Sequence, residues 1–311
     1  MTMPTGESGR PASLTVVNVL SAGRSGSTVL ATLLGQFRGV FYAGELQPLW
    51  GPAWLPDELC SCGQPALRCP IWGSVLKDVL GDEVGAAILR LRRLRDRTAR
   101  ARHVLLPRCF AGRAREAADF LAATARLYLA IQRATGCRVI VDTSKWPSYS
   151  VVAGRIAELD WRVVHLVRDP RAVAFSWGRP KRWKNARGEQ AIRLPAHRVA
   201  YYWLAQNGLI EAFRPRYAHY TRVRYEDFAA DPQAALASLL GFIGISSESA
   251  AAAARAGTGK RHILGANPDR FAPGAIVVRP DDEWRQRMSR AARWTVTALA
   301  WPLMRRYGYL G

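Results

Sequence analysis

The sequence contains no long apolar run. No segment approaches the roughly 18 consecutive apolar residues that a membrane-spanning helix requires. Residues 1–13 are polar, include an acidic residue and lack the apolar stretch of a signal peptide. These absences exclude a helical membrane span and lead us to expect a cytoplasmic protein in which residues 1–13 form a mobile tail.

Acidic residues are also scarce. The chain has 24 Asp and Glu residues against 45 Lys and Arg, which gives a net charge of +21 over 311 residues. A basic chain can bind nucleic acid, but here the basic residues are spread along the whole sequence and do not cluster in one stretch. We therefore expect no nucleic-acid partner, and we interpret the charge as favouring an anionic cofactor and a possibly anionic acceptor.

Cysteine is rare, and three of the five cysteines lie close together. Cys60, Cys62 and Cys69 form a C-x-C-x6-C pattern in a loop rich in proline and tryptophan. A zinc site needs a fourth ligand, and His103 is distant in sequence, so the pattern alone is a weak zinc signal. Reduced thiols, a local disulfide and a metal clip are all left open.

The most informative absence is a single lysine. The apolar stretch Leu14–Leu20 enters a small-residue loop and then a helix, an order that gathers backbone N–H groups around one anion. In a nucleoside-triphosphate loop the sequence G-K-[ST] is expected, but here the tripeptide is Gly26-Ser27-Thr28. A cation does occur two residues before the glycine, as Arg24, whose planar fork suits a phosphate or a sulfate.

Strands and helices alternate along the chain, which predicts an α/β fold with a parallel sheet and right-handed crossovers. Ligands should then bind at the carboxyl ends of the strands. Segment 179–195 is basic and poorly periodic and is a candidate mobile loop. We expect strands near 14–20, 40–45, 138–144, 161–168 and 219–224. Helices are expected near 27–36, 84–135 (at least two), 147–158, from Pro170 onward, and near 196–213, 232–243 and 282–306.

Two further polar groups follow predicted strands. Asp142-Thr-Ser-Lys145 ends one strand, and Lys145 is either a plain surface lysine or a cation that reaches the anion of the first loop. An apolar strand ending in Asp142 is also typical of a Mg²⁺-binding element in kinases. Arg168 ends the next strand, and Ser176 lies two turns into the following helix, a spacing that lets both hold one phosphate.

Together, Gly23-Arg-Ser-Gly-Ser-Thr28 and Leu166-Val-Arg-Asp-Pro-Arg-Ala-Val-Ala-Phe-Ser176 resemble the sulfotransferases that use 3′-phosphoadenosine 5′-phosphosulfate (PAPS), with motifs closest to the carbohydrate and protein-tyrosine branch. The resemblance implies a P-loop-NTPase-like three-layer sandwich with a helical insertion. It implies that the first motif binds the 5′-phosphosulfate, that Arg168 and Ser176 bind the 3′-phosphate, and that Lys145 contacts the phosphosulfate. The residues that it assigns to the first motif are Arg24, Ser25, Gly26, Ser27 and Thr28.

The resemblance also implies a base and a closing loop. Glu45, in Gly44-Glu45-Leu46, fits the position of the glutamate that takes the proton of the acceptor hydroxyl, although an ion pair that braces an arginine is an alternative. Segment 265–270, with Gly265, Asn267 and Arg270, resembles a loop that closes over the nucleotide. Arg24 and Lys145 would neutralise the charge that develops during transfer, and the family needs no metal for this step.

The sequence does not identify the acceptor: a glycan, a lipid, a natural product and a tyrosine are all compatible with it. We expect one sulfotransferase domain over 14–311, with an irregular and helical insertion at 48–135 on the acceptor side. The arginines of that insertion form either a solvated face or a site for an acidic acceptor. Two alternative functions are a P-loop kinase that uses ATP and Mg²⁺, and a non-enzymatic basic module that binds anions.

Overall fold

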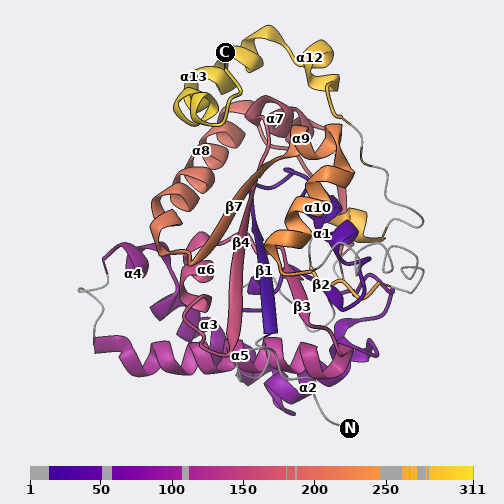
Figure 1. The fold of residues 1–311 in the computed structure, drawn as a ribbon, viewed down its shortest axis with the longest axis vertical. Coiled ribbons are helices and arrows are strands. Elements are labelled where there is room, and N and C mark those ends of the chain that lie inside the picture. Colours follow the sequence, from indigo (N-terminus) through magenta and orange to yellow (C-terminus); the bar gives the residue numbers. More distant parts are fainter. Residues whose placement is uncertain are drawn as a thin grey trace.

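A five-stranded sheet runs through the centre of the molecule, and all its strands are parallel (Figure 1). The computed structural model describes residues 14–50, 58–106, 112–179, 181–185, 188–245, 261–265, 267–271, 278 and 280–310, so the expected tail at 1–13 lies outside the described residues. The strand order is β2-β3-β1-β4-β7. The strands are β1 (Leu14–Leu20), β2 (Val40–Gly44), β3 (Val139–Asp142), β4 (Leu159–Val167) and β7 (His219–Arg224).

The central strand β1 is apolar on both faces because both faces are covered. Val16 and Leu20 pack into one apolar cluster, while Val17 and Val19 pack into another on the opposite face. Strands buried on both sides lose the alternation of polar and apolar residues, which explains the continuous apolar run in the sequence. The register places Val16 opposite Ile140 of β3 and opposite Trp161 of β4.

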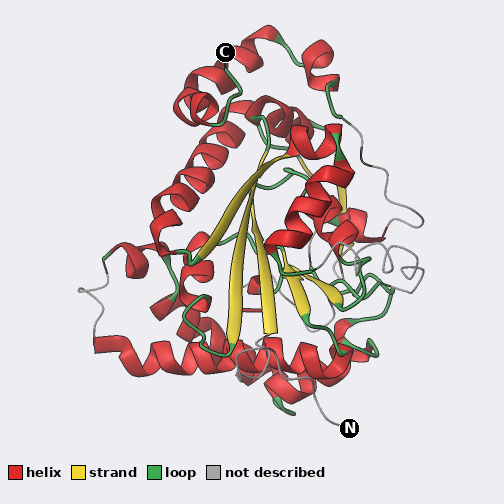
Figure 2. Ribbon diagram, in the orientation of Figure 1, coloured by secondary structure: helices red, strands yellow, loops and turns green. Residues whose placement is uncertain are grey.

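Helices cover the two faces of the sheet and one end of it (Figure 2). One face packs against α1 (Ser27–Leu34), α9 (Tyr225–Ala230) and α10 (Pro232–Phe242). The other packs against helices that include α5 (Ala114–Thr135) and α6 (Pro147–Ala153). A third cluster, formed largely by helices, joins α7 (Pro170–Gly178), α8 (Ala196–Phe213), α12 (Glu283–Arg287) and α13 (Arg290–Arg306). The predicted three-layer α/β architecture is therefore confirmed.

The described residues between β2 and β3 form two short 3-10 helices followed by α-helices. The fold places α5, its longest helix, across the amino ends of the strands, at the bottom of Figure 1. Within the described residues, no helix is both long and apolar enough to cross a membrane. The other elements of this segment are the short 3-10 helices η1 (Gln47–Trp50) and η2 (Ala66–Arg68), and the α-helices α2 (Trp72–Leu80), α3 (Val84–Thr98) and α4 (Ala101–Leu105).

Two predictions of secondary structure were wrong. Segment 179–195, the candidate mobile loop, contains an antiparallel pair of strands, β5 (Lys181–Asn185) and β6 (Gly188–Ile192). The pairing of two strand backbones needs no apolar periodicity, so the sequence pattern gave no signal for it. The single helix expected at 282–306 is divided, because the Ser289 hydroxyl accepts a hydrogen bond from the backbone N–H of Ala292 and starts α13 as a new helix.

Candidate functional site

The loop between β1 and α1 makes its turn with left-handed backbone at two residues. Arg24 has a φ of 68° and Gly26 a φ of 89°, a region that glycine enters at little cost. A Cβ atom on Gly26 would also lie 2.5 Å from two ring carbons of Tyr225. A turn of this kind at a helix N-terminus presents backbone N–H groups to an anion. Gly26 is therefore fixed both by its backbone conformation and by the close approach of Tyr225.

The hydroxyl groups of the loop meet different neighbours. The Ser27 hydroxyl accepts a hydrogen bond from Lys145 Nζ at 2.8 Å. The Thr28 hydroxyl bonds to Tyr42, and burial raises the pKa of that tyrosine well above its usual value. The Ser25 hydroxyl is buried, and no group of the described chain forms a hydrogen bond with it. Because buried hydroxyls are normally paired, Ser25 retains hydrogen-bonding capacity for a bound group.

Lys145 connects this loop to the neighbouring strand end. Its ammonium donates to Ser27 Oγ and to the carbonyl of Thr143, both at 2.8 Å, and lies 3.3 Å from Glu45 Oε1. The side chain is 16% exposed and that of Glu45 24%, so the pair is partly shielded from water. Lys145 is therefore a partly buried cation with three oxygen neighbours. The ion-pair partner of Glu45 is this lysine, where the sequence alternative supposed an arginine.

The carboxylate of Asp142 is turned into the protein. It accepts hydrogen bonds from the backbone N–H and the hydroxyl of Ser144, from the hydroxyl of Tyr128 at 2.6 Å, and from the backbone N–H of Leu46. Burial raises its pKa, and these hydrogen bonds act in the opposite direction. A carboxylate with four donors inside the protein braces the ends of β2 and β3. This arrangement argues against the kinase hypothesis, which needs Asp142 to face a metal.

Arg168 follows β4 and contacts both the β1–α1 loop and the ring of Tyr225, which packs against Gly26. One guanidinium nitrogen donates to the carbonyl of Arg24 at 2.9 Å, and another donates to Asp281 at 2.5 Å. The guanidinium carbon lies 4.5 Å from the centroid of the Tyr225 ring. The predicted phosphate-binding arginine thus lies next to the predicted phosphosulfate loop, and a carboxylate contacts the nitrogen that a phosphate would use.

Helix α7 carries Ser176 and lies against the loop through the neighbouring residue Trp177. Ser176 is partly buried in the second turn of α7. Its neighbour Trp177 lies beneath Arg24, with 5.0 Å between the guanidinium carbon and the ring centroid. The same ring comes within 3.1 Å of a Cβ built on Gly23. Burial lowers the pKa of Arg24, and the nearby Asp269 acts in the opposite direction.

The segment that we expected to close over the nucleotide runs beside Glu45. The backbone N–H of Glu45 donates to the carbonyl of Leu264 at 2.9 Å, and Gly265, with φ of 68°, leaves only 3.0 Å between its built Cβ and the Glu45 carbonyl. Arg270 is buried and pairs with Glu58 at 2.9 Å, while Asn267 accepts a backbone hydrogen bond from Arg270. Gly265 and Glu45 are thus brought together, and Arg270 is engaged by a carboxylate of the chain.

Helix α8 supplies contacts that sequence reasoning missed. The indole N–H of Trp203 donates to the carbonyl of Arg168 at 2.9 Å, and the amide of Gln206 donates to the carbonyl of Lys145. The hydroxyl of Tyr202 bonds to the backbone of Gly23 and lies within electrostatic reach of Glu45. One helix therefore holds the ends of all three motifs. The only signs of these contacts in the sequence were a tryptophan and a glutamine within the predicted helix at 196–213.

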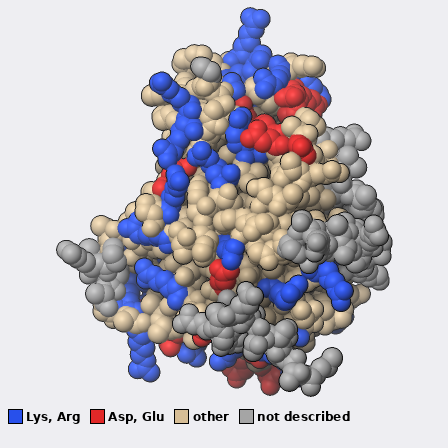
Figure 3. Space-filling view, in the orientation of Figure 1, with Lys and Arg blue, Asp and Glu red and all other residues tan. Residues whose placement is uncertain are grey.

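The arginines of α3 are not a uniform solvated face. Arg95 is buried and lies over the ring of Trp146, 5.0 Å from its centroid. Arg97 pairs with Glu116, and Arg100, which follows α3, pairs with Asp96. On the face shown in Figure 3, basic side chains are scattered between uncharged areas. Through Arg95, the insertion therefore contacts Trp146, the residue that follows Lys145.

The geometry defines a class of protein: a P-loop-like α/β fold whose strand ends gather cations, a hydroxyl-rich loop and one carboxylate. The family model described as the Sulfotransferase family matches residues 17–249. The chain belongs to the sulfotransferase family. None of the curated proteins compared with the chain matches it.

Two solved structures share this fold. The sulfotransferase domain of the olefin synthase from Synechococcus PCC 7002 is 23% identical, with a TM-score of 0.51 over 97% of this chain and 98% of that domain. The sulfotransferase domain from the curacin biosynthetic pathway is 17% identical, with a TM-score of 0.50 over 94% of this chain and 98% of that domain. At these identities the likeness concerns the fold, and it supports the P-loop-NTPase-like architecture that the motifs predicted.

Proposed function

We propose that this chain transfers the sulfuryl group of PAPS to a hydroxyl group of an acceptor molecule. The observation that carries the proposal is the position of Lys145, whose ammonium contacts both Ser27 of the anion loop and the carboxylate of Glu45. One cation thereby joins the place where a phosphosulfate would bind to the group that would receive a proton. Such a shared cation is suited to transfer between two oxygen atoms, and it goes beyond what simple anion binding requires.

The residues of the donor side fit a nucleotide with two anionic ends. Ser25 has a buried hydroxyl to offer, and the Tyr225 ring leaves no space for a side chain on Gly26. We assign the loop, with Arg24, Ser27 and Thr28 (Figure 1, between β1 and α1), to the 5′-phosphosulfate. Arg168 and Ser176 are assigned to the 3′-phosphate, because Arg168 presents a fork of donors beside the loop. When bound, PAPS supplies an activated sulfuryl group.

The catalytic roles follow from the same contacts. Glu45 accepts the proton of the acceptor hydroxyl as its oxygen forms a bond to sulfur. Lys145 and Arg24 stabilise the negative charge that grows on the phosphate oxygen as the sulfur–oxygen bond breaks. Positioned general bases contribute about 10²- to 10⁴-fold to rate. The chain's own residues thus account for proton removal and for charge stabilisation.

We place the acceptor between Glu45 and the exposed aromatic side chains around it. Trp146, next to Lys145, and Tyr202, near Glu45, are both partly exposed. Flat rings of this kind bind sugars and aromatic molecules. The insertion at 48–135 borders this side through Arg95, which lies over Trp146. The proposed acceptor is therefore a hydroxyl-bearing small molecule, glycan or lipid with an apolar or aromatic face.

A binding experiment separates this function from its alternatives. Adenosine 3′,5′-bisphosphate should raise the thermal unfolding temperature, whereas ATP with Mg²⁺ should have little effect. Stabilisation by ATP with Mg²⁺ alone would overturn the proposal in favour of a kinase. Hydroxylated metabolites are then screened with sulfur-labelled PAPS. Binding of the bisphosphate with no transfer to any acceptor and no hydrolysis of PAPS would point to an anion-binding module.

A further inference from the structure

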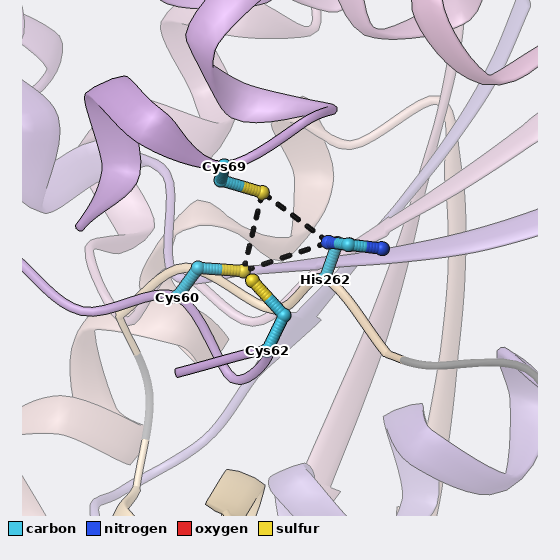
Figure 4. Close-up of side chains that lie close together, drawn as sticks. All are labelled: Cys60, Cys62, Cys69 and His262. Carbon is cyan, nitrogen blue, oxygen red and sulfur yellow. Dashed lines mark hydrogen bonds between the residues drawn. The ribbon is translucent and has the colours of Figure 1, made fainter. Parts of the chain in front are cut away.

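The three clustered cysteines meet a histidine from a distant part of the chain. Cys60, Cys62 and Cys69 lie before and within the turn that leads into α2, and His262 lies two residues before Leu264 (Figure 4). The four possible ligand atoms all lie within 4.8 Å of one another. His262, 193 residues from Cys69, supplies the fourth ligand that the cysteine spacing alone could not reveal; His103 is not part of this group.

The three separations among Cys60, Cys69 and His262 are close to the edge lengths of a tetrahedral metal site, and the Cys62 sulfur lies within 4.8 Å of the other three ligand atoms. Cys69 Sγ lies 3.6 Å from Cys60 Sγ and 3.2 Å from His262 Nδ1, and Cys60 Sγ lies 3.9 Å from that nitrogen. With zinc–sulfur bonds of about 2.3 Å and zinc–nitrogen bonds of about 2.0 Å, a tetrahedron has edges of about 3.5–3.8 Å. A disulfide between Cys60 and Cys69 would need about 2.05 Å between the sulfurs.

We propose that Cys60, Cys62, Cys69 and His262 bind a structural Zn²⁺ ion. Three thiolates and one imidazole form a soft donor set that selects zinc over magnesium or calcium. The four protein ligands complete a tetrahedron and leave no position for a water molecule or a substrate. Such closed sites are structural, whereas catalytic zinc sites keep one position open. This site is separate from sulfuryl transfer, for which no metal is expected.

The contacts around the four ligands show what the metal would hold together. The Ser61 hydroxyl bonds to the carbonyl of Arg261 at 2.6 Å and to the backbone N–H of Ile263 at 2.8 Å, and the Trp72 indole donates to the carbonyl of His262 at 2.9 Å. These bonds fix His262 against the cysteine turn. A metal ion bound by both segments would tie the cysteine turn at 60–69 to the segment around His262 more strongly than these hydrogen bonds do.

The same segment leads directly to Glu45. Two residues after His262, the backbone of Leu264 exchanges hydrogen bonds with Ala43 and Glu45, both at 2.9 Å. Gly265 then lies against the carbonyl of Glu45. The zinc ion would therefore anchor the strand-like pairing that positions Glu45. This last consequence rests on the proposed function, whereas the metal site itself rests only on the four ligands.

The test is the metal content of the full chain, purified without chelators from cells grown with added zinc. We expect about one zinc ion per chain by elemental analysis, as for a four-ligand structural site. Cobalt(II) exchanged into the protein should show the intense visible bands of tetrahedral cobalt and the near-ultraviolet thiolate-to-cobalt charge-transfer bands. Neither measurement depends on sulfotransferase activity, so the site can fail while the proposed function stands.

Variants show whether the named residues are the ligands. Cys62→Ser and His262→Asn replace partly buried residues and should lower bound zinc at least about tenfold, since loss of one ligand opens the site. Cys137→Ser, at a buried free cysteine outside the cluster, is the matched control and should retain the metal. Circular dichroism verifies that each variant is folded.

Three outcomes would overturn the proposal. One is wild-type protein that contains almost no zinc and gives an octahedral cobalt spectrum. A second is equal zinc in Cys62→Ser, His262→Asn and the control. The third is a Cys60–Cys69 disulfide, mapped by mass spectrometry, in freshly purified zinc-free protein. The zinc site is supported if Cys62→Ser and His262→Asn lose zinc and the charge-transfer bands while Cys137→Ser retains both.

Discussion

The ammonium of Lys145 and the carboxylate of Glu45 lie 3.3 Å apart, at the carboxyl ends of the paired strands β3 and β2. The same ammonium donates to Ser27 Oγ. Glu45 is thus held at its carboxylate by Lys145 and at its backbone N–H by the carbonyl of Leu264. In the proposed function Glu45 is the general base, so the acceptor hydroxyl would have to lie within hydrogen-bond reach of this carboxylate.

Replacing Glu45 by glutamine should abolish proton removal while leaving nucleotide binding unchanged. The amide keeps the size of the side chain and can still approach Lys145, but it is not a base at neutral pH. We expect turnover to fall by about 10²- to 10⁴-fold, with the affinity for adenosine 3′,5′-bisphosphate within about twofold of the wild type. The measurements are sulfate transfer with labelled PAPS and calorimetric titration with the bisphosphate.

The matched control for this change is Glu158→Gln, which removes the same charge at an exposed site. It should leave both turnover and affinity unchanged. Full activity in Glu45→Gln would assign the base to another group. A large loss of bisphosphate affinity would instead show that Glu45 acts through Lys145 on the anion loop.

Removing the Arg168 guanidinium should weaken nucleotide binding. Charge-assisted hydrogen bonds to an ion are worth about 1.5–3 kcal/mol each, so Arg168→Ala should raise the dissociation constant of the bisphosphate by about 10- to 150-fold. Arg168→Lys keeps the charge but loses the planar fork of donors, so its dissociation constant should lie between those of the wild type and of Arg168→Ala. Exposed Arg155→Ala is the control for net charge. An unchanged affinity in Arg168→Ala would refute the assignment to the 3′-phosphate.

The carboxylate of Asp281 occupies the Arg168 nitrogen that a phosphate would use, at 2.5 Å. With Arg168 assigned to the 3′-phosphate, Asp281 would compete with the nucleotide, so Asp281→Asn should tighten bisphosphate binding by about 1.5-fold to fivefold, the scale of a partly exposed ion pair. Calorimetric titration measures the change. Asp282→Asn, at the exposed neighbour paired with Arg285, should have no effect. Weaker binding in Asp281→Asn would mean that Asp281 positions Arg168 for the nucleotide.

The parallel sheet and the gathering of the three motifs could be predicted from sequence for a physical reason. Strands β1 and β4 carry apolar residues on both faces over most of their length, because both faces of the sheet are covered. Polar residues then stand where such strands end, and parallel strands end at one edge. Loop 21–28, Lys145 and Arg168 each follow a predicted strand, so their proximity was predictable.

What the sequence could not show depends on partners far along the chain. The sequence allowed Asp142 to face a metal in the kinase alternative, but its carboxylate points inward to the hydroxyl of Tyr128, on α5. Asp281 and His262 reach their sites from segments with no recognisable periodicity. The contacts from Trp203 and Gln206 depend on which face of α8 meets the strand ends. Side-chain direction and long-range pairing are tertiary properties that local pattern does not encode.

His165 is buried in β4 between two hydrogen-bond partners. Its ring nitrogens lie 2.8 Å from the hydroxyl of Tyr220 and from Oδ1 of Asn207. Burial lowers the pKa of His165 to about 4, from an ordinary value of 6.5. Between these values the unfolded chain binds a proton that the folded chain does not, so stability rises with pH across this window and is lost as pH falls through it.

The expected size of this loss follows from the two pKa values. Between pH 7 and pH 5, His165 should lower the free energy of unfolding by about 2 kcal/mol, measured by urea denaturation at both pH values. His165→Gln keeps polar atoms at the site and should remove most of this difference, whatever its effect at pH 7. His219→Gln, at a half-exposed histidine on β7, is the control and should retain the wild-type pH dependence. If His165→Gln also retained it, the acid sensitivity would belong to other groups, because a glutamine cannot take up the proton.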